Sequence, residues 1–169
     1  MSEHGTGIQP PHQPVFVGQT RARLERLFDD YPTRQACLLP ALWMVQEERS
    51  WISEAGIEEV AGVLGLTPAY VKGVVTFYTM YHTHPVGRHF IQVCTTSPCN
   101  ICGAEDVVNA LLEKTGCREL GATSPDGRFT VIEAECLGAC GFPTPILVDS
   151  DFIEDVTPDK VPGILQRYP

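Results

Sequence analysis

The sequence lacks the features that mark membrane, nucleic-acid-binding and nucleotide-binding proteins. No apolar run approaches the roughly 20 residues that cross a bilayer, so direct membrane insertion is not expected. The formal net charge of the 169 residues is −9, and phosphate binding needs clustered Lys and Arg, so nucleic acid is disfavoured. There is no G-x-G-x-x-G or Walker loop, so nucleotide binding has no support.

The N-terminal stretch MSEHGTGIQPPHQP matches neither of two common targeting patterns. It has no charged segment followed by an apolar one, and it contains no arginine and one glutamate, which argues against a secretory signal and a transit peptide. A soluble cytoplasmic protein is therefore expected. The polar stretch over residues 1–19 is expected to be a disordered tail.

After the tail, apolar residues at helical spacing predict a small helical bundle over residues 20–82. Pro40 should kink or divide the second helix, and Gly65 should end the third. A turn-rich linker is expected over residues 83–87. The four helices are expected to begin near Thr20, Thr33, Ser53 and Thr67.

Beyond the linker the pattern changes, and a compact α/β domain is expected over residues 88–169. HFIQVC and FTVIEA predict strands, with a helix over AEDVVNALLEKTG between them. PILVD predicts a third strand, DFIEDV is a candidate fourth, and TPDKVPGILQRY predicts a closing helix. The whole chain is thus predicted to be α+β.

Seven cysteines are present, an odd number that argues against a fully paired disulfide framework. Four thiolates that converge suit zinc or an iron–sulfur cluster above all. Cys94, Cys99 and Cys102 have the C-x4-C-x2-C spacing of plant-type ferredoxins, which would nominate Cys136 as the fourth ligand. The alternative joins Cys94 and Cys99 to Cys136 and Cys140 and leaves Cys102 spare.

The neighbouring residues favour this second arrangement. Cys102 leads into a helix with apolar neighbours, where a small buried thiol is unremarkable. Cys136 and Cys140 share one short loop followed by Gly141, and glycines there let backbone N–H groups approach bridging sulfides. A third interpretation keeps Cys99 and Cys102 as the C-x-x-C dithiol of a thiol–disulfide oxidoreductase, but it gives the other cysteines no role.

The pair CTTSPC and ECLGAC, preceded by GVVTFYTMY and a proline–glycine turn, resembles the thioredoxin-like [2Fe–2S] ferredoxin family. Within it, the likeness is to the members that serve respiratory complex I, NADH:quinone oxidoreductase, over roughly residues 20–169. The resemblance implies a helical N-terminal region, a thioredoxin-like domain and one [2Fe–2S] cluster. Its implied ligands are Cys94, Cys99, Cys136 and Cys140, with the first two on one iron.

The same resemblance implies an electron-transfer subunit beside a flavin-bearing partner that holds FMN, NADH and a [4Fe–4S] cluster. The complex would lie on the inner, cytoplasmic face of the cell membrane. Similar subunits serve NAD-linked hydrogenases and formate dehydrogenases, and the sequence does not choose between them. No Lys or Arg occurs between Arg88 and Lys114, while Glu133 and Glu135 flank the second cysteine pair. This acidic surround predicts a low potential of roughly −400 mV.

The remaining candidates are expected to be structural. Cys37 lies in an apolar stretch and should be plain core, and Cys117 should be a surface or half-buried thiol. Pro145 resembles a thioredoxin-fold proline that is often cis. Three histidines should be polar loop residues, and three aromatics should be core or interdomain packing: His82, His84 and His89, and Phe77, Tyr78 and Tyr81.

Overall fold

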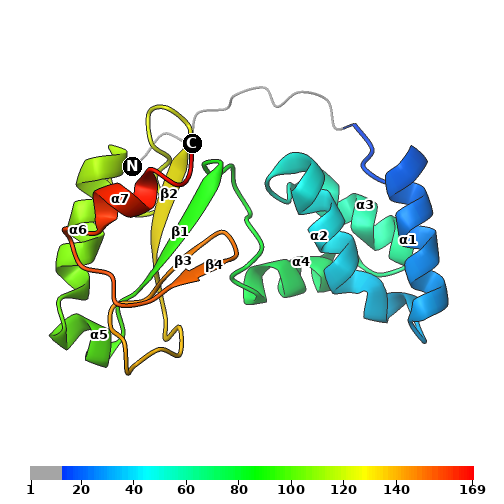
Figure 1. Ribbon diagram of the computed structural model, residues 1–169. Coiled ribbons are helices and arrows are strands. Elements are labelled where there is room, and N and C mark those ends of the chain that lie inside the picture. The colour runs from blue at the N-terminus through cyan, green and yellow to red at the C-terminus, as the bar shows by residue number, and fades with distance from the viewer. Residues whose placement is uncertain (1–12) are drawn as a thin grey trace, which may run out of the picture. The chain divides into compact units, whose positions relative to one another are not determined.

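The computed structural model describes residues 13–169 and has two compact units (Figure 1). The first unit ends at Pro85 and is helical, and the second runs from Val86 to Pro169 and contains the sheet. The predicted α+β class is confirmed. Within the described residues, no single helix is long and apolar enough to cross a membrane. Helices α3 (Glu54–Leu64) and α4 (Pro68–Phe77) pass that test only as a pair, bent by 119°.

Polar side chains start the helices of the first unit at the predicted places. The hydroxyls of Thr33, Ser53 and Thr67 each accept a backbone N–H from the residue three positions on, which satisfies a donor that the helix itself leaves open. Pro40 is the third residue of its helix, where its missing N–H costs nothing. The helices are α1 Gly18–Asp30, the 3-10 helix η1 Arg34–Cys37, α2 Leu38–Arg49, α3 Glu54–Leu64 and α4 Pro68–Phe77.

The prediction of a disordered tail over residues 1–19 is wrong from residue 13 onward. Residues 1–12 lie outside the described part of the chain. Val15 and Phe16 are buried in the helical core. Their backbone N–H groups both donate to Glu59 Oε1 at 2.8 Å. This polar stretch packs on the helical core through two apolar residues, whose backbone N–H groups also bind a side chain of α3.

The segment after α4 is held on the same core. The side chain of Gln46 donates to the Met80 carbonyl and accepts the N–H of His82, both at 2.8 Å. Tyr81 is buried, as predicted, together with Cys37. Phe77 is 77% exposed, so of the two roles expected for it, core or interdomain packing, the core role is wrong. It is the last residue of α4, and the buried residues of that helix are Val71 and Val75.

Tyr81 should make the helical unit sensitive to alkaline pH. Its hydroxyl donates to the Leu39 carbonyl at 2.9 Å, and burial, helped by the charge of Tyr78, raises the pKa of Tyr81 to about 12. An unfolded tyrosine ionises near pH 10. The native state therefore holds this proton more tightly, and its stabilising contribution is complete below about pH 10 and is lost as the pH rises through about 12.

We expect the free energy of unfolding to fall over that window and Tyr81→Phe to reduce the fall. Urea unfolding followed by circular dichroism between about pH 8 and about pH 12 would measure it. Part of the fall should persist in the variant, because burial also raises the pKa of Tyr168 in the other unit to about 12. A pH slope that is the same in Tyr81→Phe and wild type would refute the assignment.

The second unit is built on a mixed sheet in the order β2-β1-β3-β4, and all four expected strands are present (Figure 1). β1 and β2 are parallel, whereas β3 is antiparallel to both β1 and β4. Helices α6 and α7 pack against each other, and α6 contacts β1 and β2. The elements are β1 His89–Cys94, α5 Ser97–Ile101, α6 Ala104–Thr115, β2 Phe129–Ala134, β3 Ile146–Val148, β4 Asp151–Ile153 and α7 Val161–Leu165.

Two predictions about single residues of this unit are wrong. Cys117 is buried, with its Sγ 3.5 Å from the Phe129 carbonyl oxygen, because the chain turns back over β2 directly after Gly116. His89 is not in a loop but opens β1, and its Nδ1 lies 2.8 Å from Asp149 Oδ2. The one cis peptide bond of the described residues joins Pro143 to Thr144, so the bond before Pro145, which the sequence left open, is trans.

Candidate metal centre

The sheet brings the two cysteine stretches to one edge. Cys94 is the last residue of β1 and lies opposite Ala134, the last residue of β2. Because the two strands are parallel, their carboxyl ends meet at the same edge of the sheet. Cys136 follows only two residues after Ala134. The register of β1 and β2 therefore sets the distance between the two cysteine loops.

The first loop buries its two cysteines. Cys94 and Cys99 are 2% and 1% exposed and form a small cluster with Ala104, against which Leu137 packs. Cys99 sits in the short helix α5, which begins at Ser97. This helix was not predicted from the sequence, although Thr-Ser-Pro is a recognisable helix start.

The second loop lies at the surface but is tied to the first. Cys136 and Cys140 are exposed, and Gly138 between them has a φ of +87°, a conformation that glycine adopts without strain. The backbone N–H of Leu137 hydrogen-bonds to the sulfur of Cys94. This link between the loops was not predicted, because a backbone donor leaves no signal in a sequence.

The four thiols form two pairs. Cys94 acts to raise the pKa of Cys99, and Cys136 raises that of Cys140, so each thiol of a pair lies close enough to its neighbour to affect its ionisation. The two pairs also interact with each other, because the charges of Cys140 and Cys136 raise the pKa of Cys99. In residues 13–169 no three His, Cys, Asp or Glu side chains gather closely enough to hold one metal ion.

This arrangement fits a binuclear cluster better than zinc. A structural zinc ion needs four ligands around one point, with sulfurs at about 2.3 Å. A [2Fe–2S] cluster needs four cysteine thiolates divided over two irons. Two separate pairs on two loops at one edge of the sheet, with the Leu137 and Thr96 N–H groups beside the Cys94 sulfur, could supply that donor set.

Charge and hydrogen bonds set the ionisation of the thiols. Burial acts to raise the pKa of Cys94, but hydrogen bonds from the Leu137 N–H and from Thr96, through its N–H and its hydroxyl, outweigh it and lower that pKa. Burial, with the neighbouring sulfurs Cys94, Cys140 and Cys136, raises the pKa of Cys99 to about 11. These donors favour the thiolate form of Cys94, whereas Cys99 needs a positive ion to ionise near neutral pH.

Cys102 lies outside the two pairs. It caps the end of α5 and is exposed, so the expectation that it is buried is wrong. The reason is that Gly103, with a φ of +92°, turns the chain before α6 begins. A dithiol of Cys99 and Cys102 would join a buried sulfur to an exposed one, and the thiols that act on the pKa of Cys99 are Cys94, Cys140 and Cys136 rather than Cys102.

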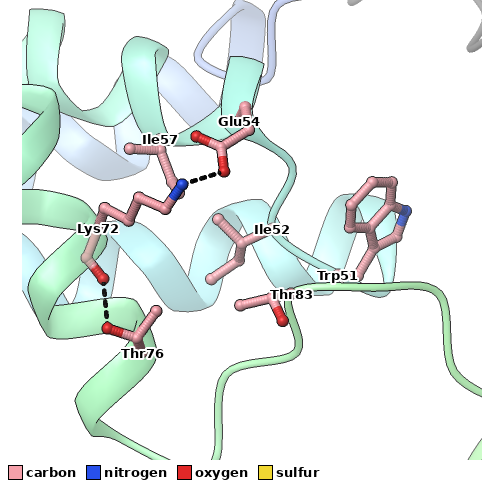
Figure 2. Close-up of a pocket in the computed structure, with 7 residues that line it drawn as sticks. All are labelled: Trp51, Ile52, Glu54, Ile57, Lys72, Thr76 and Thr83. Atoms are coloured by element: carbon pink, nitrogen blue, oxygen red, sulfur yellow. Dashed lines mark hydrogen bonds and ion pairs between the residues drawn. The ribbon is translucent and has the colours of Figure 1, made fainter. Parts of the chain in front are cut away.

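A cavity of about 460 Å³ lies in the helical unit (Figure 2). Its two charged side chains, Glu54 and Lys72, neutralise each other at 2.6 Å. It contains no cysteine or histidine and so offers nothing to metal chemistry. The lining residues are Trp51, Ile52, Glu54, Ile57, Lys72, Thr76 and Thr83.

Known proteins share this sequence pattern. Residues 24–169 match the profile of the thioredoxin-like [2Fe–2S] ferredoxin family. A subunit of the NADH-quinone oxidoreductase of Pseudomonas aeruginosa is 38% identical over 154 residues, 91% of this chain and 92% of that protein. The mitochondrial NADH dehydrogenase [ubiquinone] flavoprotein 2 of Dictyostelium discoideum is 34% identical over 160 residues, 92% of this chain but only 64% of that protein.

The fold also matches a solved structure. A chain of an NAD+-reducing [NiFe]-hydrogenase superposes with a TM-score of 0.66 at 19% identity, over 78% of this chain and 22% of that chain. At this identity the likeness establishes the fold alone. The profile match extends over nearly the whole chain and includes both cysteine loops. The chain therefore belongs to the thioredoxin-like [2Fe–2S] ferredoxin family.

Proposed function

We propose that the chain is the electron-transfer subunit of an NADH dehydrogenase module of the complex I type, with Cys94, Cys99, Cys136 and Cys140 as the ligands of one [2Fe–2S] cluster. The observation that carries the proposal is the pairing of these thiols across two loops that leave adjacent parallel strands. When bound, the cluster supplies one-electron redox chemistry. The name of the Pseudomonas relative supports the assignment to this complex.

The protein surrounds the two pairs differently. Cys94 and Cys99 are buried and closed off from water, whereas Cys136 and Cys140 are exposed. An electron-transfer partner would therefore approach from the side of the second loop. The exposed carboxylates of Glu133 and Glu135 flank it and oppose the additional negative charge of a reduced cluster, which supports the low potential expected from the sequence.

The proposed partner is a flavin-bearing, NADH-oxidising protein that holds FMN and a [4Fe–4S] cluster. The helical domain, residues 20–82, would dock on it, and residues 83–87 would link that domain to the cluster domain, residues 88–169. The exposed aromatic side chains Phe77 and Tyr78 support a docking role, because large exposed aromatics are typical of protein interfaces. Through the complex, the chain would lie peripherally on the cytoplasmic face of the membrane.

Co-expression with the flavin subunit of the same organism tests the proposal. We expect a one-to-one complex that contains FMN, elutes as one species in size-exclusion chromatography and shows the S = 1/2 signal of this chain after dithionite reduction. Two irons and two acid-labile sulfides should be found per copy of the chain alone. A protein that contains zinc, or that elutes apart from the flavin subunit, would contradict the proposal.

Two alternatives predict different results. A corresponding subunit of an NAD-linked hydrogenase or formate dehydrogenase would have the same cluster but a different flavin partner, and the neighbouring genes distinguish these cases. A thiol–disulfide oxidoreductase would reduce insulin disulfides and bind no iron. The buried position of Cys99 argues against that chemistry, because an exchanging thiolate must reach its substrate.

A further inference from the structure

We propose that the hydroxyl of Thr144 donates a hydrogen bond to a sulfur of the [2Fe–2S] centre and thereby raises its reduction potential. The inference rests on the ligand set of the proposed function. It makes Thr144 a residue that tunes the centre without being one of its ligands. The sulfur acceptor is either a bridging sulfide or a ligand thiolate, which are equivalent in this chemistry because both carry negative charge in the reduced centre.

Thr144 lies on the segment that runs from the second cysteine loop to the strand beside Cys94. The carbonyl of the next residue, Pro145, accepts the N–H of Cys94 at 3.2 Å, which continues the antiparallel pairing of Ile146 with Val93. Thr144 is the next residue along the same segment, and it follows Cys140 by only four positions. The segment thus connects the second cysteine loop to the strand beside Cys94.

The Thr144 hydroxyl is buried and has no partner within the described protein. The residue is 1% exposed, and its Oγ1 makes no hydrogen bond. Its carbonyl is already engaged by the N–H of Val156 at 3.0 Å. A buried hydroxyl without a partner is unfavourable, and most such groups in native proteins are satisfied. A centre bound at this edge of the sheet would supply the missing partner.

The position of this atom separates it from the other unpartnered polar atoms of the described residues. These are His89 Nε2 and Arg128 Nε. His89 opens β1 and Arg128 immediately precedes β2, so both lie at the end of the sheet opposite the cysteines. Thr144 is the one at the cysteine end, where negatively charged sulfur would be bound.

The residues on either side of Thr144 offer no backbone donor to the centre. Thr144 stands between Pro143 and Pro145, which have no backbone N–H to offer. The N–H of Phe142 is used inside the loop, where it donates to the Ala139 carbonyl at 3.0 Å. Hydrogen bonds to the sulfurs of iron–sulfur centres raise the potential, because they stabilise the more negative reduced form.

The test compares Thr144→Val with Thr144→Ser in the full chain. Valine keeps the shape of threonine and removes the hydroxyl, whereas serine keeps the hydroxyl. We expect the equilibrium constant for one-electron reduction to fall about tenfold in Thr144→Val, a shift of about 59 mV to lower potential. Thr144→Ser should titrate close to wild type. The readout is a potentiometric titration followed by the S = 1/2 signal, with iron and sulfide measured in each sample.

The outcomes separate this inference from the proposed function. A fully loaded Thr144→Val that titrates at the wild-type potential would overturn the hydrogen bond and leave the electron-transfer function intact. A wild-type protein without iron would overturn both. If the valine variant does not assemble the centre, Thr144→Ala removes the same hydroxyl without a branched side chain, and its potential decides the question.

Discussion

Cys140→Ala should contain no [2Fe–2S] cluster, whereas Cys102→Ala should keep two irons and two sulfides per chain. Cys140 shares the exposed loop with Cys136, which raises its pKa, so its loss would leave one pair incomplete and one iron with a single thiolate. Cys102 caps the end of α5 and its side chain is exposed. Iron and sulfide analysis, visible absorption and the S = 1/2 signal after dithionite reduction would measure the difference.

The two variants are matched, because each removes one exposed thiol from a loop of the same domain. Loss of the cluster in Cys102→Ala, with retention in Cys140→Ala, would show that the plant-type spacing of Cys94, Cys99 and Cys102 is the one in use. Loss in both would indicate that Cys102 supports assembly. Retention in both would mean that neither sulfur is an obligatory ligand.

Features with a local physical cause were predictable from the sequence. Thr33, Ser53 and Thr67 cap helices because their hydroxyls satisfy a nearby N–H, and this depends on a few neighbouring residues only. The strands β1 and β2 followed from their apolar runs. Once they are parallel, Cys94 and Cys136 must leave the same edge of the sheet.

Features that depend on distant parts of the chain were not predictable. Cys102 is exposed because Gly103 separates α5 from α6, and Cys117 is buried because β2 lies beneath it. Val15 is buried by α3, which is more than thirty residues away in sequence. The pKa of Cys94 is lowered by the backbone N–H of Leu137. The position of that N–H is set by the folded loop, and no side chain in the sequence indicates it.

Gly87→Ala should destabilise the sheet unit by about 3 kcal/mol. A Cβ at this position would lie 2.6 Å from the Phe129 carbonyl carbon and 2.8 Å from its nitrogen. These are backbone atoms of β2, so no side chain can move aside to make room. The Gly87 N–H also donates to Thr130 Oγ1 at 2.7 Å, and a strand pushed outward would lose that bond.

The effect should reach the metal centre, because Gly87 precedes the strand pairing that places Cys94 opposite Ala134. We expect the cluster absorption to bleach at lower urea concentration in Gly87→Ala than in wild type. Gly163→Ala is the matched control in the same unit: it lies within α7 with no atom near its Cβ, so the change should be neutral or stabilising by up to about 1 kcal/mol. Equal bleaching midpoints for Gly87→Ala and wild type would mean that the β1–β2 register tolerates the extra methyl group. The close approach of Gly87 to β2 would then not be what holds the two cysteine loops together.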